Sequence, residues 1–174
     1  MDEKGRDLLE TSVQWVQDEE RRRQREVEKA ARAKNWKEVQ REEPTNGLYH
    51  YQGSWGRGIA QRAIKAVIDN TLGAYETTAT VVCGTSGCLA GNIVLVAGDE
   101  FVFPGTITPG CDVDVDHCID AEGNIHQIRQ RAQDLLGVNS NEANRMFNGD
   151  LSRNQVIHVA KVTAKSYGHE LNII

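Results

Sequence analysis

The most apolar part of this sequence lies at residues 81–98 and reads VVCGTSGCLAGNIVLVAG. Thr85 or Ser86 can cap a helix here, because a side-chain hydroxyl accepts hydrogen bonds from the first backbone N–H groups of a helix. The apolar run that follows predicts a buried helix over about residues 86–97. Its β-branched pairs and Gly91 leave a buried strand as the alternative.

Further along the chain, polar and apolar residues alternate from Asp112 to Asp120. Strict alternation is typical of a β-strand, in which successive side chains point to opposite faces. The turn sequence AEGN follows at residues 121–124, and Ile125 and Gln127 come next. The pattern predicts a small β-hairpin, with residues 98–110 as loop and short extended pieces.

Apolar residues at helical spacing recur on both sides of this hairpin. Residues 57–72 predict an amphipathic helix that ends at Gly73. Beyond the hairpin, a helix from Ile128 is expected to end at Gly137, and new helices to open near residues 138–142 and at Ser152. The fold class is therefore predicted as α+β and mostly helical: a helical core with a small β-hairpin and a long charged N-terminal helix.

The N-terminal quarter differs from the rest, since residues 1–43 hold 11 Lys or Arg, 12 Asp or Glu and no Pro. This composition predicts a charged helical arm, with its Arg-rich middle in water and partner binding or self-association outside the core as its role. Its thin apolar face consists of Leu8, Leu9, Val13, Trp15 and Val16, and through this face the helix is expected to dock either on its own domain or on a second chain. A solvated helix without a partner is the alternative. The turn at residues 44–47 marks the boundary with a globular α+β domain of residues 44–174.

Composition excludes several classes of protein. The chain has 174 residues and a net charge of -5, whereas a protein that coats nucleic acid needs a basic surface. No window approaches the ~18 uninterrupted apolar residues of a membrane-spanning helix. The N-terminus reads MDEKGRDLLE, unlike a signal peptide. We expect a cytoplasmic protein that binds neither membranes nor, directly, nucleic acid.

The cysteines all lie in one region, at Cys83, Cys88, Cys111 and Cys118. Without an export signal, we expect reduced and partly buried thiols. A position at a helix start would give Cys83 or Cys88 thiolate character, so a cysteine-dependent enzyme or redox-active protein centred on them is an alternative. The apolar neighbours of both cysteines would instead raise the pKa of the thiol, which disfavours the reactive thiolate. We therefore assign no catalytic residue.

Metal-binding patterns do not fit this sequence. The gap between Cys111 and Cys118 is wider than those of zinc knuckles, and the gap between Cys83 and Cys88 is at their upper limit. Residues 112–123 open with the acidic spacing of a calcium loop but lack its glycine and its final Glu. We therefore expect no metal and no cofactor, with a metal-stabilised structural module as a further alternative.

Several motifs occur together along residues 49–165. They are an aromatic segment from Tyr51 to Trp55, a CGTxxCLAG box at residues 83–91, AxxLLG at 132–137 and EAxxxF at 142–147. This order resembles a family of small proteins of actinobacteria and their bacteriophages. The resemblance implies a phage-type origin, with the host cytoplasm as location. It marks six residues as a motif that we interpret as structural: Trp55, Cys83, Gly84, Thr85, Cys88 and Gly91.

Two charged segments are candidate interaction surfaces. The basic one contains Arg21, Arg22, Arg23 and Arg25, and the acidic one contains Asp112, Asp114, Asp116 and Asp120. The acidic residues would repeat a charge every ~7 Å along a strand, although a solvated strand edge is the favoured explanation for them. The sequence predicts a non-enzymatic, phage-type accessory protein that binds a host or phage macromolecule, namely a protein, and that can form a homo-oligomer through its N-terminal helix.

Overall fold

The structure is a computed structural model of the chain and describes residues 1–33, 49–50, 56–59, 65–69, 73–77, 86–104 and 112–174. The helices are α1 (Glu3–Ala33), α2 (Leu89–Val96), α3 (Ile128–Leu136), α4 (Ser140–Met146) and α5 (Arg153–Ser166). The strands are β1 (Tyr49–His50), β2 (Gly56–Ile59), β3 (Lys65–Asp69), β4 (Gly73–Thr77), β5 (Ser86–Gly87), β6 (Glu100–Pro104), β7 (Asp112–Val115), β8 (His117–Ile119) and β9 (Ile125–Gln127). The described residues confirm a mostly helical α+β fold with a long N-terminal helix.

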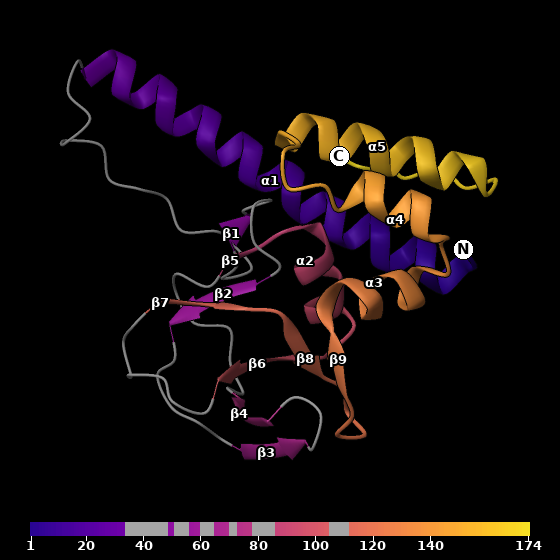
Figure 1. Cartoon of the computed structure of the whole chain (residues 1–174). Helices are drawn as coiled ribbons and strands as arrows, with labels where there is room; N and C mark the ends of the chain where they lie inside the picture. Colours follow the sequence, from indigo (N-terminus) through magenta and orange to yellow (C-terminus); the bar gives the residue numbers. More distant parts are fainter. Residues whose placement is uncertain (34–48, 51–55, 60–64, 70–72, 78–85, 105–111) are drawn as a thin grey trace.

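The strands form two sheets. The sheet that contains β3 and β4 lies on the opposite side of α2 from α1, α4 and α5, whereas β1 of the other sheet lies beside α1 (Figure 1). One sheet has the order β1-β5-β2-β7 and the other the order β3-β4-β6-β8-β9. The second sheet is antiparallel throughout, and its β8–β9 pair is the hairpin that the sequence predicts. Because only Asp116 separates β7 from β8, this short segment connects the two sheets.

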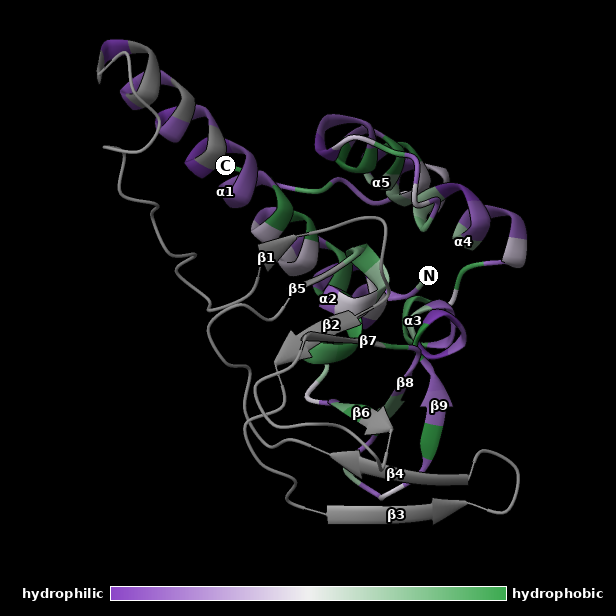
Figure 2. Cartoon of the chain, turned by 60° about the vertical axis from the view of Figure 1, so that its left-hand side comes forward, coloured by the Kyte–Doolittle hydropathy of each residue, from purple (hydrophilic) through white to green (hydrophobic). Residues whose placement is uncertain are grey.

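Helix α2 lies at the centre of the core, in the green middle of Figure 2, and confirms the predicted buried helix. Its side chains from Leu89 to Val94 are buried, and they pack with residues of α1 and α3. Burial of each Leu, Ile or Val side chain stabilises the fold by about 1.5–3 kcal/mol. The N-cap position is Cys88, two to three residues after the predicted caps, because Ser86 belongs to β5, and the Cys88 side chain makes no capping hydrogen bond.

The first half of α1 docks on its own domain, one of the two expected modes of docking, and only the expectation that the helix is not part of the core is wrong for that half. Leu9, Val13 and Val16 have no exposed surface. Gly5 permits the close approach of α1 to α3, because a Cβ atom there would lie 2.7 Å from the carbonyl oxygen of Leu136. The predicted apolar face of α1 is therefore real, and its partner is the chain's own core.

Local signals set the ends of the C-terminal helices as predicted. Gly137 ends α3 in the left-handed conformation, with φ +62°. Asn139 caps α4 and Ser152 caps α5, each in a reciprocal capping box with the residue three positions later.

The predicted helix over residues 57–72 is wrong. Residues 56–59 form β2, and residues 65–69 form β3, which pairs with β4 from Lys65 opposite Thr77 to Asp69 opposite Gly73. Gly73 therefore begins a strand. The β-branched pair Val67-Ile68 suits this pairing. Residues 100–104, within the stretch expected as loop and short extended pieces, form β6 between β4 and β8.

Candidate functional site

The thiol of Cys88 has the surroundings of a packing residue. The side chain is completely buried at the start of α2, and burial raises its pKa to about 11. Hydrogen bonds from the backbone of α2 lower the pKa by less than burial raises it. A thiol with this pKa stays protonated at neutral pH, which weakens the case for a nucleophile at Cys88.

The other residues of the CGTxxCLAG box lie mostly outside the described residues. This holds for Cys83, Gly84 and Thr85, and for Trp55 further upstream. Gly91 is buried within α2 beside Ala90. The structure thus supports the structural interpretation of the motif at Cys88 and Gly91 alone.

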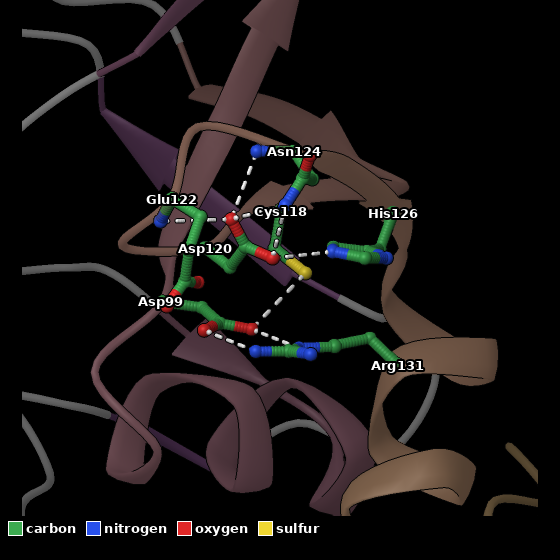
Figure 3. Close-up of polar contacts among 7 residues, drawn as sticks. All are labelled: Asp99, Cys118, Asp120, Glu122, Asn124, His126 and Arg131. Carbon is green, nitrogen blue, oxygen red and sulfur yellow. Dashed lines mark hydrogen bonds and ion pairs between the residues drawn. The ribbon is translucent and has the colours of Figure 1, made fainter.

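A polar cluster joins β8, β9, α3 and the residue Asp99 that follows α2 (Figure 3). Cys118 is completely buried in β8, and its Sγ donates to Oδ2 of Asp99 at 3.7 Å. Arg131 of α3 donates to both carboxylate oxygens of Asp99, from Nε at 2.8 Å and from Nη2 at 3.2 Å. Burial and the negative charge of Asp99 raise the pKa of Cys118 to about 12.

Asp120 holds the turn between β8 and β9. Its carboxylate accepts the backbone N–H of Glu122 at 3.1 Å and that of Asn124 at 2.8 Å. It also accepts from the amide of Asn124 and from Nε2 of His126, which lies 2.8 Å from Oδ2. The hydrogen bond from His126 is the main cause that lowers the pKa of Asp120.

This cluster contains the residue types of a catalytic cysteine–histidine–aspartate site, but its hydrogen bonds join different pairs of residues. Cys118 stands opposite His126 in the β8–β9 register. However, the thiol donates to Asp99, and His126 bonds to Asp120. Activation of a thiol needs a base within hydrogen-bond reach of it. The hydrogen bonds thus join Cys118 to Asp99 and His126 to Asp120, and the raised pKa of the thiol keeps it protonated at neutral pH.

The described residues also contain no group of three or more His, Cys, Asp or Glu side chains that could hold a metal ion. None of the described helices combines the length and the apolar character that crossing a bilayer requires.

The predicted acidic row does not form one continuous strand edge. Asp112 and Asp114 lie in β7, which pairs with β2, and their side chains are outside the described residues. Asp116 is exposed, and its carbonyl accepts the N–H of Ile128 at 2.9 Å, where the chain passes from one sheet to the other. Asp120 is engaged in the turn, with a side chain that is 5% exposed. Asp120 is therefore a structural residue, in contrast to its predicted role.

The predicted arginine segment divides between the two faces of α1. Arg22 is buried and pairs with two carboxylates, with Glu19 at 2.6 Å and with Glu26 one turn further on. Arg153 of α5 approaches Glu19 at 3.8 Å. Arg22 is thus a structural residue rather than the predicted interaction residue, because it neutralises carboxylates that are buried with it.

Arg21 and Arg25 are exposed, as the prediction of an interaction surface requires, while the side chain of Arg23 lies outside the described residues. Lys29 and Arg32 are also exposed and continue the same face of α1. Sequence reasoning missed these two, although their spacing from Arg25 is readable as i+4 and i+7. We call Arg21, Arg25, Lys29 and Arg32 the basic row.

The family resemblance of the sequence stays a prediction. Comparison of the chain with protein-family models, with curated proteins and with solved structures finds no match.

Proposed function

We propose that this protein acts by binding another protein through the outward half of α1, and that it is not an enzyme. The observation that carries the proposal is the basic row, which is exposed on a helix that extends past α5 (Figures 1 and 2). The four residues repeat at intervals of four, four and three, so they share one side of the helix and span about 16 Å along its axis.

The first half of α1 is held by the core, and this gives the outward half a defined position. Leu9, Val13 and Val16 anchor the helix from within. The ion pairs of Arg22 with Glu19 and Glu26 add support at its middle. A surface that is ordered before binding loses less conformational entropy on association, which supports recognition by this helix.

The described thiols offer little support for the alternative, a cysteine-dependent enzyme. Cys88 and Cys118 are buried, and the pKa values of both thiols are raised, to about 11 and about 12. Such thiols react slowly, because the thiolate is the nucleophile. A phage-type accessory role remains part of the proposal and rests on the sequence resemblance.

Capture from a nuclease-treated lysate of the source organism tests the proposal. The bait is the full chain, either native or as the variant R21E/R25E. The matched control is K161E/K165E, which reverses the charges of another exposed basic pair at i,i+4 spacing, on α5. We expect the native chain and the control to retain the same proteins and R21E/R25E to lose them. Equal capture by all three baits would contradict the proposal.

A further inference from the structure

We infer that the basic row binds an acidic α-helix of the partner protein, an inference that rests on the proposed function. The row presents four cations on one side of α1, at Arg21, Arg25, Lys29 and Arg32. Neighbouring members are separated by about 4.5–6 Å along the axis, the rise of three or four helical residues. A helix with carboxylates at the same intervals places one carboxylate opposite each cation.

The chemistry of the row suits carboxylates in particular. Three of its members are arginines, whose planar guanidinium groups bind carboxylates through two parallel hydrogen bonds. Two helices that pack at a small crossing angle remain in contact over the ~16 Å that the basic row spans. Charged residues along such a contact set the choice of partner and its register, as they do beside the seam of coiled coils.

Glu28 lies beside the basic row and restricts how a partner helix can align along it. Its carboxylate lies 3.9 Å from Arg32, and both side chains are largely exposed, 68% and 83% respectively. An exposed pair of this kind contributes little free energy, so a partner can replace it at little cost. The fitting helix therefore carries a basic residue opposite Glu28 among its carboxylates.

A second copy of this chain does not fit the row. Pairing two copies about a twofold axis would bring cations against cations, since every member of the row is basic. On the part of α1 that precedes the row, the last residues of the chain contact this side of the helix. There Gln14 exchanges hydrogen bonds with the backbone of Ile174 at 2.9 and 3.0 Å, and Glu10 accepts the N–H of Asn172 at 2.7 Å.

Nucleic acid fits the row less well than an acidic helix does. A phosphate backbone is negative along its whole length, and Glu28 and the exposed Asp18 on this side of α1 would repel it. The net charge of -5 adds to this repulsion. Nucleic acid is therefore an outcome that the experiment must separate from an acidic helix.

Fluorescence anisotropy with synthetic peptides tests the inference on the full chain. The probe is a labelled Ala/Gln-based helix with Glu at the intervals of the row. A second peptide has the same composition, with its Glu residues spread around the helix. A third peptide carries Lys in place of the two Glu residues that face Arg21 and Arg25. A labelled single-stranded oligonucleotide is the fourth probe.

We expect the native chain and K161E/K165E to bind the first peptide about tenfold more tightly than the scrambled one, and R21E/R25E to lose this binding. The third peptide should bind R21E/R25E more tightly than it binds the native chain, because the exchanged charges match again. Circular dichroism and thermal melting confirm that each variant is folded.

Three results would overturn the inference: equal binding of the scrambled peptide, tighter binding of the oligonucleotide than of the first peptide, or no gain for R21E/R25E with the third peptide. If lysate capture depends on the row while the acidic peptide fails to bind, the acidic helix is wrong and the proposed function stands. If capture does not depend on the row, the proposed function itself fails.

Discussion

Arg131 of α3 forms a two-point ion pair with Asp99, with 2.8 Å between Nε and Oδ2 and 3.2 Å between Nη2 and Oδ1. The Asp99 side chain is 3% exposed, whereas that of Arg131 is 23% exposed. The pair ties α3 to the end of α2, and the thiol of Cys118 donates to the same carboxylate. The buried carboxylate therefore depends on Arg131 for its charge balance.

Replacing Arg131 with Met should destabilise the protein by about 3 kcal/mol, because a buried carboxylate then loses its partner. Urea unfolding at neutral pH measures the change. The matched control is Arg145→Met on α4, an exposed arginine whose replacement should stay within about 0.5 kcal/mol. Adding Asp99→Asn to Arg131→Met should recover part of the loss. Equal effects of Arg131→Met and Arg145→Met would show that the pair contributes nothing.

Cys88 and Cys118 should react with a thiol reagent only when the protein unfolds. Their pKa values are raised to about 11 and about 12, and both side chains are buried. We expect native labelling at pH 7 to be slow and to accelerate in urea in step with unfolding. Mass spectrometry of peptides distinguishes these thiols from Cys83 and Cys111. Rapid labelling of Cys88 in the native protein, with an apparent pKa below the ordinary ~8.5, would revive the enzyme alternative.

Asp120 should make the stability of the protein depend on pH in the acidic range. Its pKa in the folded state is lowered, chiefly by the hydrogen bond from His126. A lowered pKa means stability that is present above the unfolded value of about 3.9 and is lost as the pH falls further. Asp120→Asn should therefore cost about 1–2 kcal/mol at pH 7 and progressively less below about pH 4.

Urea unfolding of the native protein and of Asp120→Asn at several pH values measures this dependence. Asp116→Asn is the matched control, since Asp116 is exposed four residues earlier. A stability difference for Asp120→Asn that stays constant from pH 7 to pH 3 would contradict the assignment.

Features with local causes were the ones that the sequence predicted. Gly137 ends α3 because glycine adopts a positive φ without strain, and Ser152 caps α5 because its side chain reaches the N–H of Gln155. The period of two residues likewise located β8, and the apolar run at residues 89–97 located α2.

Features with distant causes were missed. Residues 65–69 form β3 because β4 lies beside them, and that pairing overrides a weak helical spacing. Arg22 differs from Arg21 only in the side of α1 on which it lies. The role of Asp120 as a turn acceptor depends on where Asn124 and His126 come to lie, which alternation along one strand does not reveal.

Removal of residues 1–43 should abolish cooperative unfolding of the remaining chain, contrary to what a separate arm would imply. Leu9, Val13 and Val16 are fully buried in the same core as α2. Three such side chains supply several kcal/mol, a large share of the ~5–15 kcal/mol that typically stabilises a domain. Calorimetry of residues 44–174 is the direct measurement.

A single substitution separates loss of packing from loss of chain length. Leu9→Ala should cost about 2–5 kcal/mol, because it opens a cavity between α1 and the rest of the core. Val162→Ala on α5 is the control, since Val162 is 43% exposed and its replacement should change stability by about 0.5 kcal/mol or less. A native-like melt of residues 44–174 together with a small effect of Leu9→Ala would place the whole of α1 outside the core. If Leu9→Ala lowers the free energy of unfolding and R21E/R25E does not, the first half of α1 stabilises the core, and the basic row on its second half can be tested for binding without loss of the fold.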